Sequence, residues 1–425
     1  MKRLLYALLI LGIVAAIVIA GYLLRFKGGD TGENGGINNP PDSGTSGDFP
    51  GGGNPPPPPQ GGQGTQPPKT TPQSVLLAEQ KFGLVAQNSV MDYVVDSAQN
   101  IVIMQPDGRI VKINDKGQET ILSETPIADL FGASFSYDGS KILVLFGNRI
   151  SPQQSVFDVA SKTWRPLDPT ILEPSWSPHT KEIVYVAARG TKTTLETLDL
   201  GNAKAKPREL FSLRAFDLVP RWIAPNQILL AEKSSAATQS SLWTYDIKNK
   251  TFSPLLVDQR GLETAWNSSG TRGLAFNAAL RSGGELKLVD KTGASLRQIT
   301  LSTLPSKCLF VNETKTPSQN TTSTQSVTST VKKPPVAIKI EVLYCAIPQD
   351  RQYFLSSTLP DDYLKNALFT ADDFYGVNLT DGTTSLLFGG TGQSLDASKL
   401  KIFGSRLYFV NRLDQKLYAI LRDIF

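Results

Sequence analysis

The sequence contains very little histidine and cysteine, and this restricts the chemistry that it can perform. Its 425 residues include one histidine, His179, and two cysteines. A Ser-His-Asp triad would need this histidine, and a zinc site would need more ligands than it can offer. His179 lies in the turn of "SWSPHTKE", where another copy of the turn has Asp-Gly, so we interpret it as a surface turn residue. The composition therefore argues against histidine-dependent hydrolysis.

The sequence also lacks the short motifs that hold cofactors and metal ions. It has no Gly-x-Ser-x-Gly, no phosphate loop, no complete Gly-x-Gly-x-x-Gly and no calcium-loop spacing. We predict no cofactor, no metal and no enzymatic activity. Two alternatives stay open, because a glycosidase needs only two carboxylates and acidic oxygens bind cations. The acidic residues of a candidate cation site lie in one long insertion: Asp361, Asp362, Asp372 and Asp373.

The net charge of the chain is small and spread out. The formal charge is +5, of which residues 1–74 contribute +1. The rest is distributed over about 350 residues, which is not the concentrated basic surface of a nucleic-acid-binding protein. We expect no nucleic-acid partner.

One long apolar run stands at the N-terminus. Residues 4–24 are 21 consecutive residues without a charge, and about 31 Å of helix is enough to cross a bilayer. The run continues past the small-residue site before Gly21, so we predict an uncleaved signal anchor in residues 1–27 rather than a signal peptide. Lys2 and Arg3 favour a cytoplasmic N-terminus. The sequence thus predicts a single-pass membrane protein whose remainder lies outside the cytoplasm.

Two stretches of low complexity follow. Residues 28–74 are mainly Gly, Pro, Asn and Gln. They have too few apolar side chains to offset the conformational entropy lost on folding, so we predict that they form a disordered tether. Residues 313–336 are rich in Ser and Thr and are predicted to be a disordered surface loop. Removing this loop joins "KCLFVN" to "IEVLYCAIP", two strand-like runs that fit one hairpin.

The region between residues 75 and 425 is built from a repeat of about 44 residues. An aromatic residue opens a strand-like run in each copy, and a polar turn and an apolar strand follow it. The second half of each copy contains another strand, a Lys- or Gly-rich turn and a fourth strand, which is the pattern of a propeller blade. The aromatic residues are Tyr93, Phe135, Trp176, Trp222, Trp266 and Phe310. We interpret Trp176, Trp222 and Trp266 as core packing rather than as a carbohydrate platform, because they recur at one position of the blade.

The two ends of the repeat region complement each other. The tail from residue 399 supplies three strands of a seventh blade, and residues 80–87, "QKFGLVAQ", supply its missing outer strand. Such pairing closes the ring and leaves no free edge. We predict an all-β, seven-bladed β-propeller, with six or eight blades as alternatives.

The hairpins "SFSYDGSK" and "SWSPHTKE" resemble the Ser-Pro-Asp-Gly hairpin of TolB-like, WD-repeat-like β-propellers. The resemblance covers residues 80–425 and is to a membrane-anchored bacterial member of this family. It implies the propeller fold and leaves the function open.

The two cysteines fall on the two strand-like runs that the Ser/Thr-rich loop joins. Cys308 and Cys345 can meet disulfide geometry if these runs are antiparallel neighbours, and an exported domain lies in an oxidising compartment. We predict a disulfide that clamps the base of the loop and contributes about 3 to 4 kcal/mol. Two buried thiols are the alternative.

Propellers usually hold ligands on the end formed by the loops between second and third strands and between blades. The arginines predicted to bind a partner there are Arg149, Arg189, Arg214 and Arg281. Acidic residues share these loops, so we expect a mixed-charge surface that docks an envelope protein or a cell-wall polymer. Reversing the charges of Arg189, Arg214 and Arg281 together should weaken capture of the partner. The predicted function is a membrane-tethered binding or scaffold module; the alternative is an envelope enzyme, for example one acting on glycans, that uses carboxylates or a cation in the propeller channel.

Overall fold

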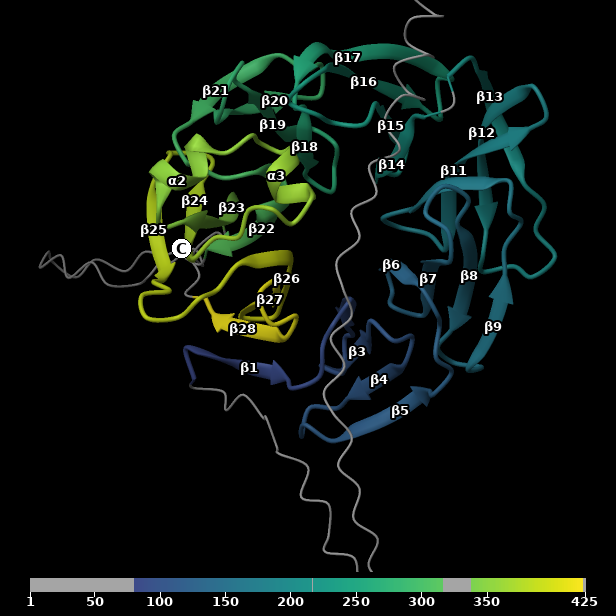
Figure 1. Cartoon of the computed structure of the whole chain (residues 1–425), viewed down its shortest axis with the longest axis horizontal. Coiled ribbons are helices and arrows are strands. Elements are labelled where there is room, and N and C mark those ends of the chain that lie inside the picture. Colours follow the sequence, from purple (N-terminus) through teal and green to yellow (C-terminus); the bar gives the residue numbers. More distant parts are fainter. Residues whose placement is uncertain (1–79, 216, 316–337, 423–425) are drawn as a thin grey trace, which may run out of the picture. The chain divides into compact units, whose positions relative to one another are not determined.

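The computed structural model describes residues 80–215, 217–315 and 338–422. They form seven four-stranded antiparallel sheets, which Figure 1 shows arranged as blades around a central axis. Six of the sheets take their strands in chain order, and the seventh has the order β26-β27-β28-β1. The seven-bladed β-propeller predicted from the sequence is confirmed.

The blades have the following strands. Blade 1 contains β2 (Asp92–Val95), β3 (Ile101–Met104), β4 (Ile110–Ile113) and β5 (Glu119–Ser123), and blade 2 contains β6 (Leu130–Phe135), β7 (Lys141–Phe146), β8 (Gln153–Asp158) and β9 (Thr163–Pro166). Blade 3 contains β10 (Ile171–Trp176), β11 (Glu182–Arg189), β12 (Lys192–Asp199) and β13 (Arg208–Leu213), and blade 4 contains β14 (Val219–Ala224), β15 (Gln227–Ala231), β16 (Gln239–Asp246) and β17 (Thr251–Arg260).

The remaining blades carry the helices. Blade 5 contains β18 (Glu263–Trp266), β19 (Arg272–Ala278), β20 (Gly284–Asp290) and β21 (Ser295–Ile299), and the 3-10 helix η1 (Pro305–Lys307) leads into blade 6. Blade 6 contains β22 (Cys308–Lys315), β23 (Ile338–Pro348), the helices α2 (Arg351–Ser356) and α3 (Asp361–Leu364), β24 (Asp372–Asn378) and β25 (Thr384–Phe388). Blade 7 contains β26 (Ala397–Phe403), β27 (Arg406–Asn411), β28 (Leu417–Leu421) and β1 (Phe82–Ala86).

The core consists of apolar side chains that neighbouring blades bury between their faces. Tyr93 is fully buried and Trp222 is 8% exposed. Trp222 packs in a cluster that joins blades 3 and 4, and Trp176 and Trp266 pack against the clusters on either side of it. The repeated tryptophans are thus core residues, as the sequence indicated.

The polar turns of the repeat shape the first hairpin of each blade. Asp138 accepts hydrogen bonds from the hydroxyls of Ser136 and Ser140, each at 2.8 Å. Gly139 follows with φ +70°, and a β-carbon there would lie 2.9 Å from Val94 Cγ1 of blade 1. Glycine is therefore required both by the backbone and by the neighbouring blade. His179 occupies the corresponding turn of blade 3, where its side chain is exposed.

The ring closes by pairing the N-terminal strand with the last blade. β1 pairs antiparallel with β28. Phe82 of β1 stacks on Phe388 of blade 6, with ring centroids 4.8 Å apart, and on Tyr418 of β28, at 5.4 Å. The outer strand predicted from residues 80–87 is confirmed. Its Phe82 side chain packs between blades 6 and 7 through these aromatic contacts.

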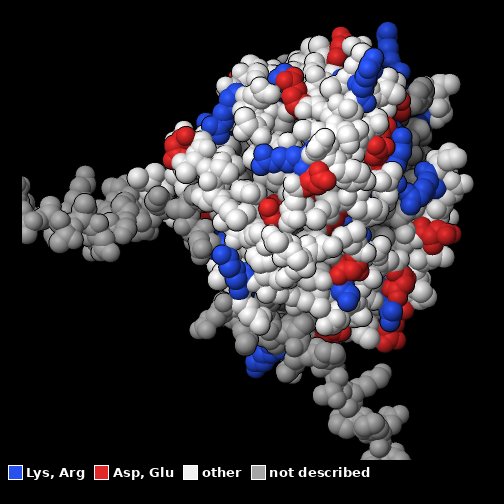
Figure 2. Space-filling view, turned by 60° about the vertical axis from the view of Figure 1, so that its left-hand side comes forward, with Lys and Arg blue, Asp and Glu red and all other residues white. Residues whose placement is uncertain are grey.

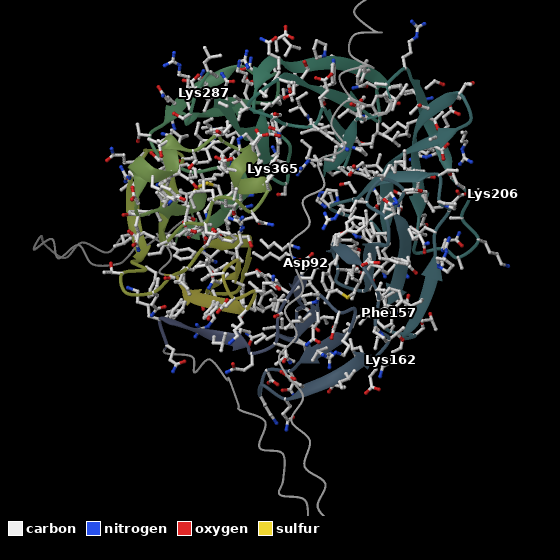
Figure 3. All side chains as sticks on the ribbon, in the orientation of Figure 1. Asp92, Phe157, Lys162, Lys206, Lys287 and Lys365 are labelled. Carbon is white, nitrogen blue, oxygen red and sulfur yellow. A yellow bond between two sulfur atoms is a disulfide. The ribbon has the colours of Figure 1, made fainter. Side chains whose placement is uncertain are left out.

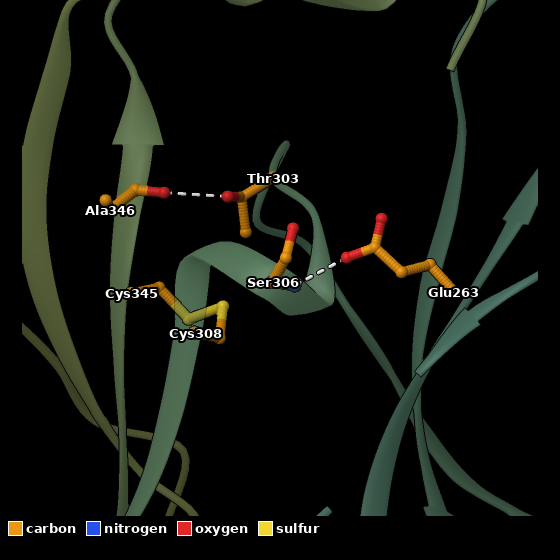
Figure 4. The surroundings of a disulfide bond; sticks show 6 residues. All are labelled: Glu263, Thr303, Ser306, Cys308, Cys345 and Ala346. Atoms are coloured by element: carbon orange, nitrogen blue, oxygen red, sulfur yellow. Dashed lines mark hydrogen bonds between the residues drawn. A yellow bond between two sulfur atoms is a disulfide. The ribbon is translucent and has the colours of Figure 1, made fainter. Parts of the chain in front are cut away.

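The cysteines lie at one end of the β22–β23 hairpin. Cys308 and Cys345 are directly opposed in the ladder and joined by a disulfide (Figure 4). The ladder continues to the pair Lys315 and Ile338, which flanks the Ser/Thr-rich segment. The prediction that the bond clamps the base of this loop is therefore wrong, since the disulfide lies at the opposite end of the hairpin, beside η1. Cys308 begins β22 and Cys345 lies beyond the middle of β23, so several residue pairs of the ladder separate the disulfide from the segment.

Several predictions concern residues outside the described ranges. These are the membrane helix in residues 1–27, the tether in residues 28–74 and nearly all of the loop in residues 313–336. Within the ranges that the structure describes, no helix has the length and apolar character needed to span a bilayer.

Candidate docking face

The two ends of the propeller differ in the length of their connections. We call the end with the loops between second and third strands and between blades the loop face, and the end with the hairpin turns the turn face. The loop face consists of residues 87–91, 105–109, 124–129, 147–152, 167–170, 189–192, 214–218, 232–238, 260–262, 279–283, 300–307, 349–371, 389–396 and 412–416. It carries all four arginines singled out from the sequence.

Those arginines are not equivalent. The Arg149 guanidinium lies 4.9 Å from the centre of the Phe131 ring, which gives it a cation-π contact. Arg214 and Arg281 are exposed, and neither has an ion-pair partner among the described residues. These three side chains present charge toward solvent on blade 2, on the loop between blades 3 and 4, and on blade 5.

Arg189 is instead part of the structure of blade 3. Its Nε and Nη2 atoms donate to the two carboxylate oxygens of Glu196, both at 3.0 Å. Glu196 is 4% exposed and also accepts from the Tyr185 hydroxyl at 2.9 Å. The bonds from Arg189 lower the pKa of Glu196, although burial opposes this. Reversing the charge of Arg189 would leave a buried carboxylate facing another carboxylate, so this residue is a poor probe of partner binding.

Basic residues are concentrated in one sector of the loop face. The loops of blades 2 to 5, from 147–152 through 279–283, contain seven Lys or Arg residues and three Asp or Glu residues, whereas the remaining loops contain six and eight. We call the loops of blades 2 to 5 the basic sector. Figure 2, turned to bring the left side of Figure 1 forward, shows both signs of charge separated by wide uncharged areas. By the counts along the loops, basic residues outnumber acidic ones only in the basic sector.

Residues 349–371 form an insertion between β23 and β24 that covers neighbouring blades. The Asp361 carboxylate accepts from the Ser235 hydroxyl at 3.1 Å and from the Ala236 amide at 2.6 Å, both on blade 4. The Ser357 carbonyl accepts from the Gly283 amide of blade 5 at 3.0 Å. The insertion thus connects blade 6 to blades 4 and 5.

A cluster of buried charges holds the base of the insertion. Lys307 Nζ is fully buried and lies 2.7 Å from Asp372 and 2.6 Å from Asp396. Burial would lower the pKa of Lys307, but the two carboxylates raise it above its usual value. Arg412 of blade 7 bonds Asp396 at 2.8 Å, and its guanidinium lies 3.8 Å from the centre of the Tyr363 ring of the insertion. Two cations and two carboxylates therefore balance where blades 6 and 7 meet the insertion.

Large apolar side chains are exposed on and around the insertion. Half of the fourteen exposed large apolar residues of the described chain lie on the loop face, although such residues are ordinarily scattered. Leu280 of blade 5 is 75% exposed and Ile150 of blade 2 is 93% exposed. The other five are Tyr353, Leu355, Leu364, Phe369 and Leu413. Four of the seven lie on the insertion, Leu413 lies on blade 7, and Ile150 and Leu280 lie within the basic sector. Exposed apolar side chains beside charged ones are features of a protein-docking surface.

The acidic residues considered as a cation site have separate partners. Asp361 bonds blade 4, Asp372 pairs with Lys307, and Asp362 accepts from the Thr358 amide at 2.7 Å. Asp373 accepts from Gln349 Nε2 at 2.9 Å. In the described parts of the chain, no group of three or more His, Cys, Asp or Glu is placed to hold a metal ion. These aspartates fix the insertion in position.

Carboxylates on the innermost strands also have different partners. Asp92 lies near the middle of the ring in Figure 3 and bonds Lys401 at 3.0 Å. Glu173 lies 3.7 Å from Lys233. Glu263 Oε1 accepts from the Ser306 amide at 2.6 Å (Figure 4), while its Oε2 is buried without a partner. Burial raises the pKa of Glu263. A fourth carboxylate of this kind, Glu313 on β22 of blade 6, accepts from the Tyr344 hydroxyl at 3.0 Å and pairs with Arg422. Glu313 and Glu263 lie on the neighbouring blades 6 and 5, but each bonds different groups of the fold.

Comparisons with known proteins identify the fold. No protein-family model matches the chain, and no curated protein sequence is similar to it. Oligogalacturonate lyase from Vibrio parahaemolyticus is a similar solved structure, with a TM-score of 0.50 and 8% identity over 80% of this chain and 93% of that chain. The β-propeller domain of the Trilobed protease from Pyrococcus furiosus has a TM-score of 0.46 and 11% identity over 78% of this chain and 95% of that one.

TolB from Acinetobacter baumannii is also among the similar structures. Its TM-score is 0.37 at 10% identity over 78% of this chain, and the match spans 63% of the TolB chain. The solved neighbours are thus TolB and other β-propeller proteins, some of them enzymes. At these identities the likeness shows the propeller fold alone.

Proposed function

We propose that the chain is a membrane-tethered, extracytoplasmic β-propeller that binds an envelope protein through its loop face. The observation that carries this proposal is the juxtaposition of exposed apolar side chains on an anchored insertion with the basic sector. An apolar centre and a charged rim are the usual anatomy of a protein interface. The proposed partner presents an acidic segment beside apolar side chains.

The anchoring of the insertion supports a binding role. An apolar loop that moved freely would lose conformational entropy on binding. The insertion is instead tied to blade 4 by Asp361 and to blade 7 by Arg412. Its apolar side chains are therefore presented on a preformed surface.

Site-specific crosslinking in intact cells tests the proposal. A photo-crosslinking amino acid at Arg281 or Leu364 on the loop face should trap one and the same protein, which mass spectrometry identifies. The control position is Lys162 on the turn face, at the periphery of the ring (Figure 3). Equal capture from Lys162, or different proteins from the two loop-face positions, would contradict the proposed docking.

Charge reversal then tests the partner's chemistry. Changing Arg149, Arg214 and Arg281 to Glu should weaken binding of the trapped partner at least tenfold, and the loss should diminish in high salt. The matched control changes Lys116, Lys162 and Lys206, exposed on turn-face connections, to Glu, which alters the net charge equally. Equal weakening by both sets would show a general charge effect and reject the basic sector as the site.

A further inference from the structure

A cavity of about 410 Å³ lies between blades 4 and 5 on the turn face. Its walls come from the β14–β15 turn and the adjoining ends of β16 and β17 in blade 4, and from Ser269 and Lys291 of blade 5. The volume falls in the range of small-molecule sites, about 300 to 1,000 Å³. The cavity opens on the opposite end of the propeller from the insertion, so it is distinct from the docking face.

Two glycine turns of blade 5 fix the shape of this cavity. Gly270 packs so closely on blade 4 that a β-carbon there would lie 2.2 Å from Gln227 Oε1. Gly293 packs on the outer strand of blade 4, where a β-carbon would lie 2.1 Å from the Leu255 carbonyl oxygen. Both have positive φ, +68° and +83°, so each turn depends on glycine for its backbone as well as for its contact. The two blades therefore meet at an inner and an outer contact, with the cavity at this junction.

The cavity is lined by polar side chains, several of which have no partner within the described chain. Its apolar lining residues are Ala224 and Pro225. The side chains without a hydrogen bond or ion pair among the described residues are Asn226, Thr251, Ser253 and Lys291. They offer an amide, two hydroxyls and an ammonium group within one small space.

The remaining polar groups of the lining are held in place. Gln227 Nε2 donates to Thr244 Oγ1 at 3.2 Å. The Asp246 carboxylate accepts from the Asn249 amide at 2.8 Å and from Asn249 Nδ2 at 2.9 Å. The negative charge of Asp246 is thus engaged by its own turn, which leaves Lys291 as the cation available to a ligand.

We propose that this cavity binds one unit of a saccharide, and that Lys291 favours a unit that carries a carboxylate or a phosphate. Each sugar hydroxyl both donates and accepts hydrogen bonds, so it matches amide and hydroxyl side chains that also do both. An apolar ligand would dehydrate these groups without replacing their hydrogen bonds, which is unfavourable. A free simple anion could accept hydrogen bonds from Lys291, the amide and the hydroxyls, but it would leave most of the cavity of about 410 Å³ unfilled.

Binding of named sugars to the full-length chain tests the proposal. Saturation-transfer NMR and calorimetry would use glucose, glucuronic acid and glucose 6-phosphate, with inorganic phosphate as the simple anion. We expect dissociation constants of about 1 mM for the acidic sugars, weaker binding of glucose, and weaker binding of phosphate than of glucose 6-phosphate. Absence of saturation transfer from all three sugars would overturn the proposal, and equal binding of phosphate and glucose 6-phosphate would reduce the site to an anion site.

Variants locate the binding. The double change Asn226→Leu and Ser253→Leu should abolish saturation transfer, whereas Lys291→Met should remove the preference for glucuronic acid and leave glucose binding intact. The control is Thr163→Leu. Thr163 is the first residue of the outer strand of blade 2, the position that Thr251 has in blade 4. Undiminished saturation transfer in the double variant would overturn the assignment of the cavity.

Equal losses of glucose and glucuronic acid binding in Lys291→Met would reject the role of Lys291 in selecting the acidic sugar. Unchanged capture of the loop-face partner by these variants would show that the two sites are independent.

Discussion

Blades 2 and 6 have the same four-stranded sheet but are stabilised in different ways. Blade 2 has short connections and buries apolar residues such as Leu143 and Phe157. Its Lys141–Asp158 pair lies where the two central strands β7 and β8 reach the turn face, with side chains 12% and 31% exposed. Blade 6 is interrupted by two long insertions and carries the disulfide, while Lys307 and Asp372 are fully buried beside it. Blade 2 is stabilised mainly by its apolar faces. Where insertions interrupt the repeat, the protein adds buried ion pairs and a covalent link.

The largest difference in stability between blades 6 and 2 should appear when a paired lysine of each blade is replaced by methionine. Lys307→Met should destabilise the propeller by about 3 to 5 kcal/mol, because it leaves Asp372 and Asp396 buried with one cation fewer. The matched change Lys141→Met in blade 2 should cost about 1 kcal/mol or less, since that pair is partly solvated. Urea unfolding followed by tryptophan fluorescence measures both. Equal losses would show that burial does not distinguish the two pairs.

Removal of the disulfide should have the next largest effect. Changing Cys308 and Cys345 to Ser should cost about 2 to 4 kcal/mol, because the bond restrains the unfolded chain between them. Thermal unfolding with and without reductant provides the control, since reductant should lower the midpoint of the native chain and leave that of the double variant unchanged. A native midpoint that is insensitive to complete reduction would contradict this prediction.

Loss of the bond between the insertion and blade 4 should have a smaller effect. Asp361→Asn should cost about 1 to 2 kcal/mol by weakening the bonds to Ser235 and Ala236. Hydrogen exchange should show faster exchange of the Ala236 amide and of the insertion. The control is Asp350→Asn, because Asp350 caps α2 through the Tyr353 amide and bonds no other blade. Faster exchange at Ala236 in both variants would mean that the insertion moves as one unit rather than being held by Asp361.

The smallest effect should be a gain in stability. Because burial raises the pKa of Glu263, folding favours the protonated carboxyl; this stabilisation is present below the pKa of the unfolded chain and is lost as pH rises through the folded pKa. Glu263→Gln keeps an acceptor for the Ser306 amide without the charge. It should raise the melting temperature at pH 8 and change it little at pH 4. A variant less stable than the native chain at pH 8 would show that the charge of Glu263 is stabilising.

The repeat was visible in the sequence because each of its signals is local. An aromatic strand, a polar turn such as Asp138-Gly139 and an apolar strand lie within about a dozen residues of one another. The pairing of β1 with β28 joins the two ends of the domain, yet it followed from counting strands. By contrast, the contact of Asp361 with Ala236 links residues 125 positions apart, and no local pattern indicates it.

One ion pair of the candidate site, between Arg189 and Glu196, could have been suggested from the sequence. In the β11–β12 hairpin Tyr185 opposes Glu196, and Arg189 lies four residues after Tyr185 on the same face of the sheet. That register suggests the pair between Arg189 and Glu196 once the hairpin turn has been placed. The burial of Lys307 had no such signal, because a lysine before a strand is ordinarily solvated.

The pattern of residues along the chain indicated the blade repeat, the closure of the ring and the tryptophan core, and favoured seven blades over six or eight, because alternation of apolar and polar residues specifies strands wherever one face must be buried. The charges that hold the fold could be told from those that face solvent only once the chain was folded. This distinction depends on the partners and the burial that each charge acquires when the chain folds. Lys307 is buried between two carboxylates, and Arg189 is held by the buried Glu196, while Arg214 and Arg281 have no ion-pair partner among the described residues.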